Sequence, residues 1–296
     1  MSIRDLARYA HRAMHFSALP SHYGAWFIDA GRLYVSDQEN RGRQLRRHVG
    51  VLQPLVSHTW RRIVRHLQPT VVLDIGANYG EITFCSRYPA NCRVFTVEAN
   101  PTLLPFLERS LAGHPDRPQI RLVSKAASDR AGSVSMTIDE KWSGTSSAVG
   151  AMPDPDNRFK GAGPERTRLV EVDAITIDSL LDGMPADRLA IKLDVEGYEA
   201  RVLRGMHETL ARTRQFIAIM EFDGDKLTRA ATPPAEALAL MLDLGLVARF
   251  TRDGGLVEFA RADDLPQHCD VILASHRALL EALAPLPRWV RRYAAG

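Results

Sequence analysis

From Thr70 onward the chain alternates short apolar segments with segments of helical periodicity, and this alternation limits the possible folds more than any other feature. The apolar segments are rich in Val, Ile and Leu without polar alternation, which is typical of strands buried on both faces of a parallel sheet. The pattern predicts a doubly wound, Rossmann-like α/β fold with a mostly parallel seven-stranded sheet. The expected strands are Val71–Ile75, Arg93–Val97, Ile120–Val123, Leu189–Leu193, Phe216–Met220, Leu246–Phe250 and Val271–Ala274.

Helical periodicity marks the segments between and before these strands. Asn100 is placed to cap the second helix, with Pro101 at its first position. We divide the chain into an N-terminal helical extension (residues 1–68), a main domain (69–275) and a basic helical tail (276–296). The expected helices are Ser2–Phe16, Arg43–Leu67 with a break at Pro54, Gly80–Ser86, Pro101–Gly113, Glu199–Ala211 and Pro234–Leu244.

Composition and charge bear on the partners and the cellular compartment that we expect for this protein. The net charge of +3 on 296 residues is close to balance and gives no reason to expect a nucleic-acid partner. Three cysteines without a CxxC motif predict neither a disulfide framework nor a thiolate metal site, and they fit a reducing compartment. No apolar run approaches the ~20 residues of a membrane helix, so a cytoplasmic location is expected. The Arg-, Trp- and Tyr-containing tail can make peripheral membrane contact, although such tails more often dock on their own domain.

The stretch "VVLDIGANYG" predicts a ligand site after the first strand of the sheet. Asp74 ends the strand, and Gly76 and Gly80 bracket Ala77 and Asn78 in a loop where the backbone can approach a ligand closely. Asn78 stands where a dinucleotide-binding GxGxxG motif requires glycine. We expect Asp74 to repel a diphosphate and to favour a ligand that carries positive charge.

The next strand ends in "VEANP", which adds Glu98, Ala99 and Asn100 to the predicted site. Glu98 is placed to accept hydrogen bonds from both ribose hydroxyls of an adenosine, although an acid here also serves NAD. Together with the preceding loop, Glu98 favours S-adenosylmethionine over NAD as the cofactor.

A second constellation lies in "LAIKLDVEGYEARVLRG", where Asp194, Glu196 and Glu199 follow a buried strand that contains Lys192. Neighbouring carboxylates repel one another unless a cation, a proton or a basic side chain offsets their charge. Such clusters are typical of functional sites. For Glu199 alone, capping of the following helix is the more ordinary interpretation.

The four pieces "VVLDIGANYG", "VEANP", "AASDRAGSV" and "IKLDVEGYEARVLRG" together resemble the FkbM-type family of S-adenosylmethionine-dependent methyltransferases. The resemblance runs from about Leu67 to Phe222 and less clearly to Ala274. It implies the class I methyltransferase fold and methyl transfer to a hydroxyl oxygen, often on a sugar or a polyketide-like small molecule. It also implies that Ser128 and Asp129, which follow the third strand, lie where such enzymes frame the adenine.

Transfer to a hydroxyl calls for a group that removes its proton, and Asp194 and Glu196 are our candidates for this base. Glu221, in "AIMEFDGD", ends the neighbouring strand and can join them. The same three acids can hold Mg²⁺, but we favour a metal-free site. The segment "SDRAGSVSMTIDEKWSGTSSAVG" predicts a turn and one short strand, followed by a Ser- and Gly-rich loop. The hydroxyls of "WSGTSSAVG" in this loop either line the acceptor pocket or belong to an ordinary polar loop. The Pro- and Gly-rich "MPDPDNRFKGAGPERTR" that follows predicts a surface loop.

Two other readings stay open from the sequence. The chain can be a catalytically silent module that binds a cofactor or partner, although both acidic constellations are retained. A nicotinamide-dependent oxidoreductase would need a glycine in place of Asn78 and a Tyr-xxx-Lys or comparable motif, and the sequence shows neither.

Overall fold

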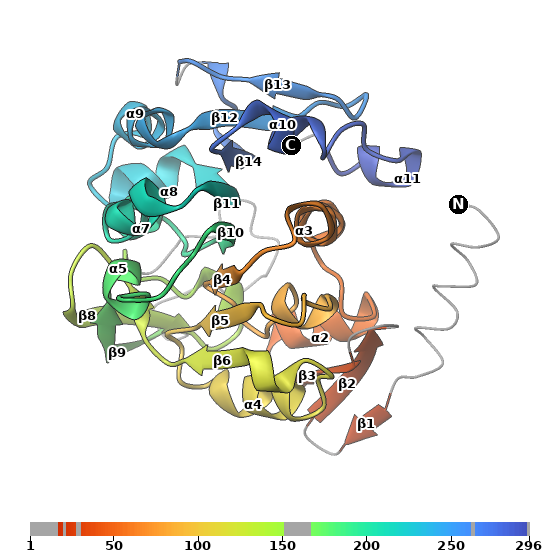
Figure 1. The fold of residues 1–296 in the computed structure, drawn as a ribbon. Coiled ribbons are helices and arrows are strands. Elements are labelled where there is room, and N and C mark those ends of the chain that lie inside the picture. The colour runs from red at the N-terminus through yellow and green to blue at the C-terminus, as the bar shows by residue number, and fades with distance from the viewer. Residues whose placement is uncertain (1–16, 20–21, 28–30, 151–166, 262–263, 295–296) are drawn as a thin grey trace.

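The computed structural model describes residues 17–19, 22–27, 31–150, 167–261 and 264–294. Its centre is an eight-stranded sheet in which five neighbouring strands are parallel, and β14 runs antiparallel to β11 (Figure 1). All seven strands predicted from the sequence are present, and the short edge strand β13 is the addition. In sheet order the strands are β13 (Leu256–Glu258), β12 (Leu246–Phe250), β14 (His268–Ala274), β11 (Gln215–Asp223), β10 (Arg188–Leu193), β4 (Val71–Ile75), β5 (Arg93–Val97) and β6 (Ile120–Val123).

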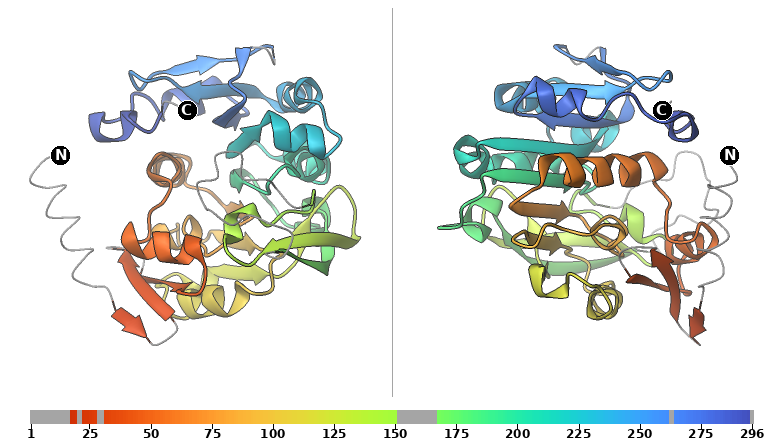
Figure 2. Two further views of the ribbon diagram at one scale, coloured as in Figure 1. Left: turned by 180° about the vertical axis from the view of Figure 1, so that it is seen from behind. Right: turned by 45° about the vertical axis from the view of Figure 1, so that its right-hand side comes forward.

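Helices cover both faces of this sheet, which confirms the doubly wound α/β class (Figure 2). One face packs against α3 (Pro54–Leu67), η1 (Thr83–Cys85), α4 (Leu104–Ala112) and the C-terminal α10 (Arg277–Glu281) and α11 (Arg288–Arg291). The other packs against α5 (Ile177–Leu180), α6 (Glu199–Arg204), α7 (His207–Arg212), α8 (Gly224–Arg229) and α9 (Pro234–Leu244).

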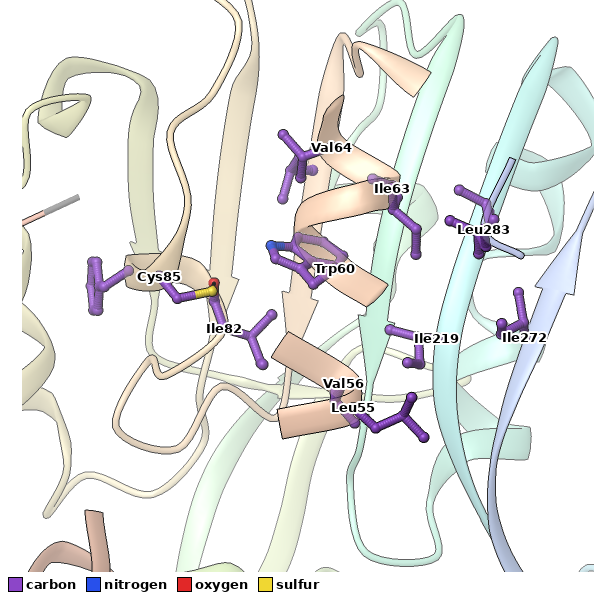
Figure 3. Packing of buried hydrophobic residues seen from close by; sticks show 14 of the residues in the cluster. Leu55, Val56, Trp60, Ile63, Val64, Ile82, Cys85, Ile219, Ile272 and Leu283 are labelled. Atoms are coloured by element: carbon purple, nitrogen blue, oxygen red, sulfur yellow. Dashed lines mark hydrogen bonds between the residues drawn. The ribbon is translucent and has the colours of Figure 1, made fainter. Parts of the chain in front are cut away.

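Helix α3 anchors the first face because its apolar residues recur at helical spacing. Figure 3 shows Trp60 and Ile63 of this helix among side chains that come from β11, β14 and the segment around η1. Trp60 is fully buried. The sequence predicts a break at Pro54, and the structure confirms it. Pro54 is the first residue of α3, a position where the missing N–H of proline costs nothing.

The N-terminal extension is not helical throughout, and this part of the prediction is wrong. Residues 17–36 contain an antiparallel sheet of β1 (Ser17–Leu19), β2 (His22–Phe27) and β3 (Gly31–Ser36), followed by α2 (Asn40–Arg47). In β3, Leu33 and Val35 are buried while their neighbours are less so, a period-two pattern that belongs to a strand. The predicted helix Ser2–Phe16 lies outside the described residues.

Three predicted helices differ from expectation in length or continuity. The segment Gly80–Ser86 forms only the 3-10 turn η1, because the Asp74 carboxylate captures the Thr83 N–H at 3.0 Å. The helix expected over Glu199–Ala211 is divided into α6 and α7 at Gly205, which packs tightly against the Ser128 carbonyl. Helix α4 begins at Leu104 rather than Pro101, and the Asn100 side chain instead accepts hydrogen bonds from Thr102.

A second small sheet lies beside the carboxyl ends of the central strands and was only partly predicted. It consists of β7 (Ala126–Ala127), β9 (Thr167–Ile175) and β8 (Gly132–Asp139), and only the strand now seen as β8 was expected. The Pro- and Gly-rich loop expected after it lies mainly in residues 151–166, outside the described part of the chain. Short 3-10 turns also occur at η2 (Arg117–Gln119) and η3 (Ser143–Thr145).

The C-terminal segment docks on the domain through α10 and α11. Leu283, Leu286 and Val290 are buried in the same cluster as α3, whereas Trp289 and Tyr293 stay exposed. Within the described ranges, no helix combines the length and apolarity needed to span a membrane. Membrane contact by the tail and the three-part division of the chain stay predictions.

Candidate active site

The main cavity opens where the order of the central strands reverses, between β4 and β10. The chain passes from β4 to β5 and β6 on one side and then crosses to β10 and β11 on the other. Doubly wound sheets bind their ligands at the carboxyl ends of such strands. The cavity has about 710 Å³ of empty space, including its open mouth, and is lined by residues that follow β4, β5, β6 and β10, by the β8 loop and by α2.

The loop after β4 forms the floor of this cavity and requires glycine at position 76. Gly76 has a φ of +74°, and a Cβ there would lie 1.8 Å from the Asp194 carbonyl oxygen. The loop and the end of β10 can therefore touch only with bare backbone at this point. Asn78 is also left-handed, with a φ of +52°, and it lines the cavity.

Asp74 does not face the cavity, which corrects the expectation that it meets the ligand. Its side chain is 0% exposed, and Oδ2 accepts hydrogen bonds from the Thr83 N–H and Oγ1 at 3.0 and 2.6 Å. Successive strand residues point to opposite faces, so Asp74 shares the α3 face with Val72. Burial raises the pKa of Asp74 above its usual value, and the nearby Lys192 ammonium only partly opposes this shift. Asp74 therefore stabilises the segment after the glycine loop through Thr83 and does not line the cavity.

Glu98 lies at the end of β5 with its carboxylate in the cavity wall. It is 6% exposed, and its two oxygens accept backbone hydrogen bonds from Asn78 at 2.6 Å and Asn100 at 2.7 Å. A carboxylate offers about four lone-pair positions, so both oxygens can accept further bonds from a ligand. The geometry fits the predicted ribose contact, and it shows that Glu98 also orders the glycine loop.

At the other end of the cavity, Asp194 and Glu196 lie beside Glu221 of β11. One carboxylate oxygen from each of the three lies within 4.8 Å of the others. The Lys226 ammonium of α8 sits against this cluster, 2.6 Å from a Glu196 oxygen and 2.7 Å from a Glu221 oxygen. Lys192 lies 3.5 Å from Asp194. Asp194 and Glu196 line the main cavity, whereas Glu221 lies behind them.

The pKa values of these acids separate because their neighbours differ. Burial opposes ionisation of Asp194, but Lys192, Lys226 and Arg41 outweigh it and lower the pKa of Asp194. Burial and Glu221 raise the pKa of Glu196 well above its usual value. The surroundings of Asp194 thus favour its ionised form, whereas burial and Glu221 act against ionisation of Glu196.

The three carboxylates offer the oxygen ligands that Mg²⁺ prefers, so the donor set fits a cation. Lys226 already supplies positive charge to two of these carboxylates, those of Glu196 and Glu221. The chain's own ammonium therefore offsets the repulsion that the sequence predicts for this cluster.

The structure brings about half of the predicted site residues to the cavity. Gly76, Asn78, Glu98, Ala99, Asp194 and Glu196 line it, whereas Asp74, Ala77, Gly80, Asn100, Ser128, Asp129 and Glu221 do not. Ser128 is buried, and the adjacent Asp129 lies 3.4 Å from Arg201. The residues before Ser128, at positions 125–127, line the cavity instead.

Two contributions to the cavity wall come from outside the central sheet. The "WSGTSSAVG" loop, left undecided between pocket and ordinary loop, lines the cavity through Ser143, Ser146 and Ser147. Arg41 of α2 also lines it, and sequence reasoning missed this residue. Its only signal, a position in the arginine-rich "NRGRQLRRHV", is shared by arginines that face solvent.

Comparison with known proteins gives the family. Residues 74–247 match the family described as the methyltransferase FkbM domain. The chain belongs to the FkbM methyltransferase family. The match contains the glycine loop, Glu98 and the whole acid cluster, and it ends within β12. The family expected from the sequence motifs is confirmed, and the domain is that of a methyltransferase.

Other similarities of this FkbM-family chain are weaker. It is 36% identical over 121 residues to the DNA mismatch repair protein MutS 1 of Haloarcula marismortui, covering 37% of this chain but only 13% of that protein. A methyltransferase FkbM structure from Methylobacillus flagellatus KT has a TM-score of 0.38 at 14% identity, covering 69% of this chain and 43% of that one. The O-methyltransferase TomG from Streptomyces achromogenes, in complex with SAM, has a TM-score of 0.39 at 13% identity, covering 76% and 80%.

Proposed function

We propose that this protein is an S-adenosylmethionine-dependent O-methyltransferase that methylates a hydroxyl of a small molecule or glycan. The observation that carries the proposal is that one cavity contains two acids with different roles. Glu98, beside the glycine loop, is placed to bind a nucleoside, and Asp194 is the acid whose surroundings favour the ionised form. The family match covers both ends.

The cavity residues fit the parts of S-adenosylmethionine by charge and shape. Glu98 is placed to accept ribose hydroxyls, and Gly76, which also lines the cavity, lets the glycine loop lie against the end of β10. Asp194, rather than Asp74, provides the negative charge that favours a cationic ligand. When bound, S-adenosylmethionine supplies a methyl group activated by the positive sulfonium.

Asp194 is our choice for the group that takes the proton from the acceptor hydroxyl. Its lowered pKa keeps it in the basic form at neutral pH, and it lines the cavity. As the oxygen gains the methyl group, its proton passes to an Asp194 carboxylate oxygen. A positioned base of this kind contributes about 10²–10⁴-fold to rate. Lys192 and Lys226 hold Asp194 and its neighbours in place.

The Ser-rich loop of residues 143–147 supports a hydroxylated acceptor. Its side chains already exchange hydrogen bonds with the catalytic side of the cavity, since the Ser147 hydroxyl donates to the Glu196 carbonyl at 2.8 Å. Hydroxyl groups of this kind can pair with the polar groups of a sugar or polyketide-like acceptor.

The test is to incubate the protein with methyl-labelled S-adenosylmethionine and small-molecule extracts of its own cells. We expect a labelled product whose methyl group is on oxygen, formed by the unaltered chain and lost with Asp194→Asn. The variant should still bind S-adenosylhomocysteine, because amide and carboxylate have the same shape. Binding of S-adenosylhomocysteine without any labelled product would favour the catalytically silent module. Unchanged turnover in Asp194→Asn would remove this residue from the mechanism.

A further inference from the structure

Arg41 is a partly buried cation in the cavity wall that comes from outside the matched family domain. It lies in the first turn of α2, whereas the family match begins at residue 74. Its side chain is 14% exposed and lines the cavity. The guanidinium lies close to the backbone of Gly144, where a Cβ would be 2.9 Å from Nη1.

The guanidinium of Arg41 lacks hydrogen-bond partners among the residues that the structure describes. Nε is buried without a partner, and the nearest carboxylate oxygen, on Glu81, is 3.8 Å from Nη2. The Leu52 and Gln53 N–H groups bond the other oxygen of Glu81, and the oxygen that faces Arg41 has no hydrogen-bond partner either, because 3.8 Å is too long for a hydrogen bond. A guanidinium offers five donors, and leaving a buried one such as Nε unpaired costs free energy. The site is therefore built to receive an anionic group.

Arg41 lines the same cavity as Asp194. Its charge is one of those that lower the pKa of Asp194. Glu98, in contrast, is held by the Asn78 and Asn100 N–H groups at the nucleoside end. A ligand that spans the cavity from Glu98 past Gly76 to Asp194 therefore reaches the part of the cavity on which the charge of Arg41 acts.

We propose that Arg41 binds the carboxylate of the cofactor's methionyl group, so that the segment before the family domain completes the cofactor site. The inference rests on the proposed use of S-adenosylmethionine. Planar guanidinium and carboxylate groups pair through two parallel hydrogen bonds, which a lysine cannot reproduce.

The test compares two ligands that differ by the amino-acid part. Titration calorimetry would measure binding of S-adenosylhomocysteine and of 5′-methylthioadenosine, which has no carboxylate, to the full chain and to Arg41→Met. We expect Arg41→Met to lose about 10- to 100-fold in affinity for S-adenosylhomocysteine and less than about twofold for 5′-methylthioadenosine. Arg43→Met is the matched control, because Arg43 is exposed on the same helix and its side chain bonds Asn40 of that helix.

The outcomes separate this inference from the proposed function. Equal losses for both ligands would show that Arg41 only supports the fold of the wall and would overturn the inference. Unchanged S-adenosylhomocysteine affinity with a raised acceptor KM would also overturn it and would assign Arg41 to the acceptor. If the unaltered chain binds neither ligand, the proposed cofactor itself is wrong. Thermal unfolding of the unliganded variants checks that they are folded.

Discussion

Replacing Lys226 with Met removes the cation that holds the acid cluster together. Its ammonium lies 2.6 Å from Glu196 and 2.7 Å from Glu221, and all three side chains are at most 17% exposed. Breaking a buried ion pair from one side costs about 3–5 kcal/mol, because the remaining charges are left uncompensated. With a urea m value of about 3 kcal/mol per M, the unfolding midpoint should fall by about 1–1.7 M at pH 8.

The pH dependence of this loss follows from the sign of the pKa shifts. The pKa values of Glu196 and Glu221 are raised in the folded chain, by burial first and then by neighbouring carboxylates. A raised carboxyl pKa lowers stability as pH climbs above the unfolded value near 4.5, because the unfolded chain then releases its proton more readily. Without Lys226 the pKa values of Glu196 and Glu221 rise further, so these acids become protonated more readily at pH 5.5. The loss of unfolding free energy caused by Lys226→Met should therefore be smaller at pH 5.5 than at pH 8.

Urea unfolding at pH 8 and 5.5, with and without Mg²⁺, measures these effects. The variant exposes three carboxylate oxygens to a cation, so Mg²⁺ at ten times its Kd should restore about 1.4 kcal/mol at pH 8. Lys141→Met, at an exposed lysine, is the control and should change the midpoint little. The reasoning is refuted if Lys226→Met unfolds at the unaltered midpoint, or if its loss is equal at both pH values and insensitive to Mg²⁺.

Three further predictions follow from the site. Burial and Glu221 raise the pKa of Glu199 to about 7, so this acid lowers the stability of the folded chain as pH rises from 4.5 to 7. Glu199→Gln should therefore reduce the fall in Tm over this pH range, and an unchanged slope of Tm against pH would contradict a raised pKa at Glu199. Gly76→Ala should lower Tm and S-adenosylhomocysteine affinity far more than Gly183→Ala, which has a similar φ but no atom within 4 Å of the new Cβ; equal effects would contradict the close contact at Gly76. Methyl transfer should survive EDTA treatment because Lys226 supplies the positive charge, and loss of activity restored by Mg²⁺ would show that a metal is required.

The central sheet could be predicted because its strands are uniformly apolar and separated by clear helical segments. Strands β4, β5, β6 and β12 have the predicted bounds. The N-terminal strands β1 to β3 are only three to six residues long, and they were missed although β2 contains the apolar run "AWF" and β3 the run "LYV". Strand β9 was missed because its exposed and half-buried residues alternate with few buried ones.

The site residues that follow the strand ends could be predicted from the order of the elements. The residues whose place depends on the direction of a side chain could be predicted less well. Gly76, Glu98 and Asp194 follow strands that end at the same edge of the sheet, and their meeting follows from topology. Asp74 was placed on the wrong side, although strand alternation with the buried Val72 contains the needed information. Arg41 and Lys226 reach the site from α2 and α8, and no local motif distinguishes them from solvent-facing basic residues.

Titration calorimetry with S-adenosylhomocysteine and with NADH tests the central claim most directly. The cavity pairs a ribose-binding acid with an ionised Asp194, so we expect S-adenosylhomocysteine to bind with one site per chain and NADH to give no measurable heat. Binding of NADH by a chain that ignores S-adenosylhomocysteine would contradict the account.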